Sequence, residues 1–337
     1  NKIFNEKLVT QKENGVKPVS TFKMPAHFGK LSSLACSVLR TLIYADLFEY
    51  PLKADEIHEG LIASRASLTD VIGSLNESSL EKYIENSNGF YFLKGKKDTI
   101  ENRKFREKVS QTILFKNRRI LQFICNFPFV QAAALSGAMA FKNCLPDDDI
   151  DLFLIVNSRR IWSVYLFLAA FLKLTGKRNL ICLNYLYAKK DLTVAEKDFF
   201  IAHQIANLRF LYGTGIYQEF CRFNDWLREY LPQAEPNKSN FISKKFVTST
   251  KIIFNDFEFS YKRAIEKLFG LRAFDKIEQW VFRLYGGHIR KMTAHMNGSV
   301  QVEKDLIKLF TNDHRQTIIH KFQRRLKEIE EEIEIEN

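Results

Sequence analysis

Two aspartates, Asp149 and Asp151, have the type and spacing of ligands for a divalent cation. They flank Ile150 and lead into an apolar run, Leu152 to Val156, that is typical of a buried strand. Because alternate residues of a strand point to the same side, both carboxylates project together from the mouth of this strand. Hard cations such as Mg²⁺ or Mn²⁺ bind carboxylates and neutralise phosphate oxygens during phosphoryl and nucleotidyl transfer. We therefore predict that Asp149 and Asp151 are catalytic metal ligands.

The tripeptide Ser136, Gly137 and Ala138 lies upstream of these aspartates, with Gly137 twelve residues before Asp149. It follows an apolar run of strand length, residues 129–135, and opens a short predicted helix. The missing Cβ of Gly137 lets backbone N–H groups at a helix N-terminus approach an anionic triphosphate. Such a glycine is a weak signal alone, but a strand, turn, helix and second strand with Asp-x-Asp make it more specific.

Residues 136–152 resemble the Gly-Ser and Asp-x-Asp signature of the polymerase-beta nucleotidyltransferase superfamily. The whole chain also resembles an uncharacterised bacterial group that places a winged helix before such a domain. Short sequence motifs at residues 46–52, 89–93 and 202–206 are the basis of that second resemblance.

The resemblance implies a reaction and a set of site residues. Ser136, Gly137 and Ala138 would hold the triphosphate of an NTP such as ATP, and Asp149 and Asp151 would bind two Mg²⁺ ions. A hydroxyl of RNA, of a protein or of a small molecule would attack the α-phosphate and release pyrophosphate. The nucleotide preference, the acceptor and the oligomeric state do not follow from these residues.

The sequence departs from that signature at two positions. Ala138 stands where the family has serine, which removes a hydroxyl contact but keeps the backbone donors. The family's third carboxylate comes from a later strand, and the predicted strand at residues 180–187 offers Asn184 instead. We predict Asn184 to be a metal ligand through its amide oxygen, although an amide cannot act as a base. Otherwise the third carboxylate comes from elsewhere, or the domain is catalytically inactive.

Positive charge is concentrated ahead of the motif. The chain has 337 residues and a formal charge of +12, which favours an anionic partner. Residues 94–119 contain ten lysines and arginines, and the last two, Arg118 and Arg119, lie just before the first predicted strand. We predict that this pair contacts the triphosphate or a polynucleotide; a solvated helix face is the alternative.

The elements that must position these residues predict an α/β (α+β) fold. Periodicity indicates three helices and an Asn-Gly hairpin, which together make a winged helix-turn-helix, and then a small mixed sheet. A helical pattern follows, including one helix over residues 194–212. The expected units are a flexible arm (1–30), the winged helix (31–98), the nucleotidyltransferase core (99–192) and a helical C-terminal domain with a charged tail (193–337).

The predicted winged helix favours a protein-facing or scaffolding role over DNA binding. Its third helix contains Arg65 but also Asp70 and Glu77, whereas phosphate contact requires several basic side chains. The competing function for the whole chain is a degenerate nucleotide-binding or regulatory module, whose winged helix contacts DNA or protein.

Cysteine usage and hydropathy indicate a cytoplasmic protein without a membrane partner. The five cysteines are scattered, with no C-x-x-C pair, which favours a reducing compartment. The longest apolar stretch, residues 161–174, is shorter than the roughly 20 residues of a membrane span, so it predicts a buried helix. On another apolar helix, His203 is predicted to be a hydrogen-bonded packing residue rather than a base.

Overall fold

A computed structural model describes most of the chain, namely residues 28–29, 31–234, 260–294, 299–310 and 313–335. Of the predicted N-terminal arm only Phe28 and Gly29 are described, and Phe28 is buried. The rest of the arm lies outside the described residues, as does most of the stretch 232–240, whose two prolines predict a linker. Within them, no helix is both long enough and apolar enough to cross a membrane.

The N-terminal unit has three helices followed by a two-stranded hairpin. Ser67 caps the third helix in a capping box with Asp70, and both turn residues, Asn88 and Gly89, have the positive φ that a tight hairpin turn requires. This is the element order that the winged-helix prediction requires. The elements are α2 (Ser33–Asp46), α3 (Ala54–Glu59), α4 (Leu68–Leu75), β1 (Ile84–Ser87) and β2 (Phe90–Leu93).

The middle of the chain forms a mixed sheet that begins after a long helix, and the class is α/β. Strand β3 is antiparallel to β4, and β4 is parallel to β5, with α7 in the crossover. The elements are α5 (Thr99–Cys125), β3 (Val130–Leu135), α6 (Gly137–Ala140), β4 (Ile150–Val156), α7 (Ile161–Leu174) and β5 (Ile181–Ala188). Their positions confirm the elements predicted for residues 101–187 within a few residues.

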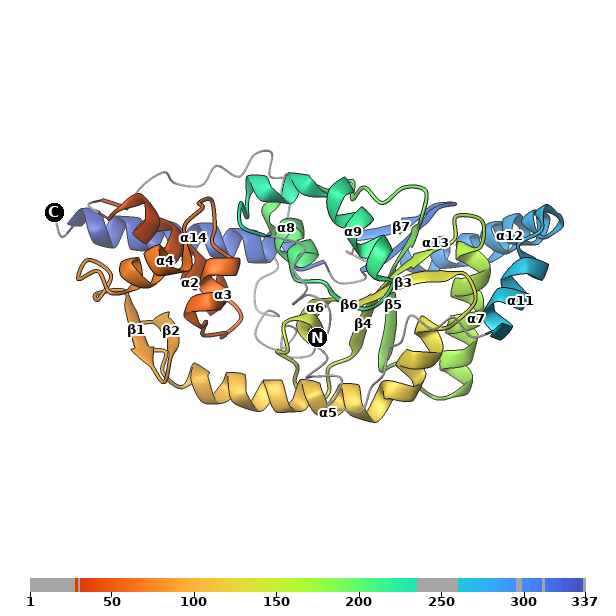
Figure 1. Ribbon diagram of the computed structural model, residues 1–337, viewed down its shortest axis with the longest axis horizontal. Coiled ribbons are helices and arrows are strands. Elements are labelled where there is room, and N and C mark those ends of the chain that lie inside the picture. The colour runs from red at the N-terminus through yellow and green to blue at the C-terminus, as the bar shows by residue number, and fades with distance from the viewer. Residues whose placement is uncertain (1–27, 30, 235–259, 295–298, 311–312, 336–337) are drawn as a thin grey trace.

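The C-terminal part adds helices and three further strands. The six-stranded sheet has the order β6-β3-β4-β5-β8-β7, so both of its edges come from this region (Figure 1). The elements are α8 (Phe199–Ala206), β6 (Arg209–Tyr212), α9 (Thr214–Phe223), η1 (Asp225–Glu229), α11 (Ser260–Phe269), η3 (Arg272–Phe274), α12 (Asp275–Val281), η4 (Phe282–Gly286), α13 (Gly287–Thr293), β7 (Ser299–Val302), β8 (Leu306–Phe310) and α14 (Arg315–Ile335).

The prediction of a single helix over residues 194–212 was wrong. That segment holds α8 and then β6, which pairs antiparallel with β3. A short apolar run fits a buried helix and a buried strand equally well, and here the partner strand, far away in sequence, decides. Strands β7 and β8 were not predicted either. The charged tail is a helix, α14, but Phe322, Leu326 and Ile329 are buried, so it is neither the solvated helix nor the frayed terminus that its charge suggested.

The sheet lies between two layers, and each layer covers one hydrophobic cluster. Helices α5 and α7 pack on one face with Leu152 and Leu154 of β4. Helices α8, α9 and α14 and the N-terminal unit share the other cluster with Phe153 and Ile155. Every residue of β4 is buried, as the prediction of a sheet covered on both sides requires.

Two arginines of the predicted basic stretch join α5 to the N-terminal unit. Arg103 forms an ion pair with Glu56 and lies over the Tyr50 ring, and Arg106 forms an ion pair with Glu49. Both arginines are buried, so their charge is used inside the fold rather than offered to an external anion.

Candidate metal centre

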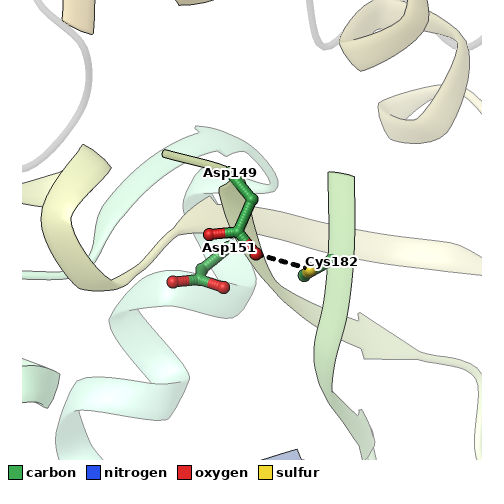
Figure 2. A group of neighbouring side chains, drawn as sticks. All are labelled: Asp149, Asp151 and Cys182. Atoms are coloured by element: carbon green, nitrogen blue, oxygen red, sulfur yellow. Dashed lines mark hydrogen bonds between the residues drawn. The ribbon is translucent and has the colours of Figure 1, made fainter. Parts of the chain in front are cut away.

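The carboxylates of Asp149 and Asp151 lie together at the start of β4, as predicted. Phe153 and Ile155 alternate with Leu152 on this strand, so the two aspartates face the side that the N-terminal unit and α14 cover. Figure 2 shows both side chains beside Cys182 of the neighbouring strand, and one ligand atom from each of the three lies within 4.8 Å of the other two.

Gly137 allows the loop before α6 to touch the Asp151 carboxylate. Its φ is +57°, and a Cβ built at this position would lie 2.5 Å from Oδ2 of Asp151, too close for any real side chain. Ser136 fixes the same loop, because its backbone N–H donates to the carbonyl of Asp151 at 2.9 Å. The missing Cβ of Gly137 therefore makes room for a carboxylate oxygen of Asp151, whereas the close approach to a triphosphate expected from the sequence stays a prediction.

Asp148 and Asp151 lie close together in the sequence but have different surroundings. Asp148 is buried, and its Oδ2 accepts the Leu145 N–H at 2.9 Å, which closes the turn before β4. Asp151 is only 8% exposed, and burial, followed by the charge of Asp149, raises the pKa of its carboxyl well above the usual range. Two carboxylates brought together at a buried site repel, and a bound cation would relieve that repulsion.

Strand β5 supplies two polar side chains beside the aspartates. Cys182 pairs with Asp151 across the strands, and its thiol donates to Asp149 Oδ2 over a sulfur-oxygen distance of 2.8 Å. Burial and the charge of Asp149 raise the pKa of this thiol. The register of β4 and β5 then shifts, so that Asn184 is the unpaired residue of a β-bulge.

The predicted ligand Asn184 reaches the site, but through its nitrogen. Its Nδ2 donates to Asp151 Oδ1, so the amide holds the carboxylate in place rather than pointing its oxygen at the aspartates. Cys182, which sequence reasoning missed as a site residue, contacts the other aspartate, Asp149. The signal was present, since Cys182 is two residues before Asn184 and strand alternation puts both on one side.

The loop after α6 is held by α5 rather than by Arg118 or Arg119. The Cys144 N–H donates to Ser110 Oγ at 3.0 Å, and Arg106 Nη1 lies 3.3 Å from Asn143 Oδ1. Arg118 donates to the carbonyl of Phe115 on its own helix and lies over the Phe115 ring. Arg119 is exposed on α5. The structure therefore places Ser136, Gly137 and Ala138 beside the aspartates, whereas Arg118 makes its hydrogen bond within its own helix.

The third helix of the N-terminal unit has little basic surface to offer a nucleic acid. Arg65 Nε donates to the carbonyl of Pro232 at 3.0 Å, and the Ala66 N–H donates to Gln233 Oε1 at 2.8 Å. On α4 itself, Leu68 and Ile72 are exposed. Helix α4 contains no lysine or arginine, and the choice between a protein-facing and a DNA-binding role stays a prediction.

His203 is a packing residue, as predicted. It is 6% exposed, and its ring stacks on Tyr44 with the ring centroids 4.1 Å apart. The expected hydrogen bond is not made by Nε2, which has no partner among the described residues. Burial lowers the pKa of His203 to about 3.

This pKa predicts a loss of stability in acid. An unfolded histidine titrates near pH 6.5, so the unfolded chain binds a proton that the folded chain refuses between about pH 6.5 and about pH 3. The contribution is fully present above pH 6.5 and falls by about 1.4 kcal/mol for each pH unit below it. His203→Phe should flatten this slope in urea unfolding at stepped pH, while His320→Asn, at an exposed site on α14, should not. Equal slopes in both variants would contradict the assignment.

The donor set fits a divalent cation. Asp149 and Asp151 offer carboxylate oxygens, and a cation would relieve the repulsion between them at this buried site. No third carboxylate joins the two aspartates within the part of the chain that the structure describes; Cys182 completes the group instead.

Comparison with known proteins adds no relative. The chain matches no model of a protein family, no curated protein and no solved structure.

Proposed function

We propose that the chain is a nucleotidyltransferase of the polymerase-beta type, which transfers a nucleoside monophosphate from an NTP to a hydroxyl acceptor. The observation that carries the proposal is the contact between Gly137 and Asp151, at which the loop before α6 meets the carboxylate pair. A glycine loop suited to phosphate and a carboxylate pair suited to a cation meet at one point.

Each residue has a role that its position supports. Asp149 and Asp151 hold the divalent cation, Mg²⁺ or Mn²⁺, and Asn184 orients Asp151 through its N–H. Ser136, Gly137 and Ala138 present backbone to the triphosphate, with Ser136 tied to β4. The acceptor hydroxyl gives up its proton to solvent as its oxygen forms a bond to the α-phosphorus, the bond to the bridging oxygen of the β-phosphate breaks, and pyrophosphate leaves. When bound, the cation supplies charge neutralisation at the phosphate oxygens.

The test measures binding and chemistry separately. We expect calorimetry to detect NTP binding only when a divalent cation is present. We also expect the protein to release pyrophosphate when total cellular RNA and protein extract are supplied as acceptor sources. Asp149→Asn and Asp151→Asn should each lower release at least about 100-fold, as loss of a preorganised charged group usually does. Asp147→Asn removes an exposed carboxylate from the same loop and is the matched control.

A second function, a nucleotide-binding module without catalysis, is favoured by the missing third carboxylate. It predicts cation-dependent NTP binding without pyrophosphate release from any acceptor source. Unchanged binding and release in the Asp149 and Asp151 variants would exclude both functions.

A further inference from the structure

Cys182 lies beside Asp149 and Asp151, on the strand from which a third acidic ligand was expected and two residues before the predicted ligand Asn184. It lies on β5, directly across from Asp151, and its sulfur is 2.8 Å from Asp149 Oδ2. Ligand atoms that share one divalent cation lie about 3 to 4.5 Å apart when metal–ligand distances are near 2.0–2.3 Å. The group formed by Asp149, Asp151 and Cys182 is within 4.8 Å, so little movement would close it around one ion.

The neighbouring amide does not compete for this role. Asn184 donates its N–H to Asp151 Oδ1, so in this structure it contacts the site as a hydrogen-bond donor. The two carboxylate oxygens and the Cys182 sulfur lie within 4.8 Å of one another (Figure 2). Sulfur is a poor ligand for Mg²⁺ and a good one for Zn²⁺ and Co²⁺.

We propose that Cys182 is the third ligand of the cation held by Asp149 and Asp151, and that the site binds thiophilic divalent cations more tightly than Mg²⁺. This inference rests on the proposed cation site and changes its metal class. On binding, the sulfur–hydrogen bond is replaced by a sulfur–metal bond, and the proton passes to the buffer.

Co²⁺ is the probe that tests this ligand set. The full chain, reduced with a phosphine so that no competing thiol is present, should show a thiolate-to-cobalt absorption band in the near ultraviolet. The band should saturate at one equivalent, persist in excess Mg²⁺ and disappear when Zn²⁺ is added. Absence of the band in the wild-type protein would overturn the proposal without any variant.

Substitution of single cysteines tests whether Cys182 supplies the sulfur ligand. Cys182→Ser should lose the band and weaken Co²⁺ binding at least about tenfold, the smallest cost usual for disturbing a metal site. Cys221→Ser, at a half-buried cysteine on α9, should keep both. Cys182→Asp restores an oxygen ligand and should raise Mg²⁺ affinity at least about tenfold. A band that survives in Cys182→Ser would assign the sulfur elsewhere and overturn the proposal.

The outcomes separate this inference from the proposed function. A cobalt band that depends on Cys182, in a protein that neither binds NTP nor releases pyrophosphate, keeps the metal centre and rejects the transferase. Pyrophosphate release that is equal in Cys182→Ser and wild type, with Mg²⁺ and without a cobalt band, keeps the transferase and rejects the sulfur ligand.

Discussion

Gly137→Ala is expected to abolish cation-dependent nucleotide binding and to destabilise the fold at the same time. The new methyl group would lie 2.5 Å from Asp151 Oδ2, so the carboxylate must move away from its position beside Asp149. The φ of +57° adds backbone strain of about 1 to 2 kcal/mol for any residue with a side chain. A displacement of about 1 Å at a reacting centre can cost about 100-fold in rate, and we expect at least that loss of pyrophosphate release.

Two other glycines separate the causes of this effect. Gly89→Ala introduces a methyl group at a φ of +77° with nothing within 4 Å, so it measures the backbone strain alone. Gly215→Ala lies in α9 with no positive φ and open space, and should be neutral or slightly stabilising. Urea unfolding and cation-dependent NTP binding are measured on all three variants. Equal loss in Gly137→Ala and Gly89→Ala would show that the contact with Asp151 is unimportant.

The parts of this centre that a sequence can reveal are those with local causes. Alternation along one strand places Asp149 and Asp151 on one side, and a glycine at a strand end marks a close approach. Both features follow from neighbours within a few residues, and the structure contains both. The same holds for the hairpin at Asn88 and Gly89, where the turn needs a positive φ.

The remaining parts depend on which strands become neighbours. Cys182 reaches Asp149 because β5 pairs with β4 in a particular register, and Asn184 reaches Asp151 from the position at which that register shifts. A cysteine in a strand pattern is easily counted as apolar, which hid Cys182. Strand alternation nevertheless places Cys182 on the same side of the strand as Asn184. Arg209 shows the same limit, since its donation to the carbonyl of Ala140 exists only because β6 is a strand beside β3.

The boundary between the N-terminal unit and the sheet illustrates a further limit. Sequence patterns predicted separate units, but one hydrophobic cluster contains residues of both. Phe322 of α14 is fully buried and stacks on Phe199 of α8 with ring centroids 5.0 Å apart. The Phe322 ring also makes an edge-to-face contact with Tyr44 of α2, with ring centroids 5.4 Å apart, so the C-terminal helix joins the two parts.

Phe322→Ala should therefore destabilise the N-terminal unit and the sheet together. Truncating a buried phenylalanine costs about 3 to 5 kcal/mol, a large share of the stability of an ordinary domain. Because the cluster is shared, we expect one cooperative transition at a lower urea concentration, followed in parallel by far-ultraviolet circular dichroism and tryptophan fluorescence.

Arg324→Ala is the control for this variant. It lies on the same helix with a side chain that is 73% exposed, and its ion pair with Glu328 should contribute less than about 1 kcal/mol. Should the N-terminal unit of Phe322→Ala unfold first while cation binding at Asp149 and Asp151 is kept, the two parts would be independent. The joint transition, by contrast, would mean that the layer covering the carboxylate face is held in place from the C-terminal end of the chain.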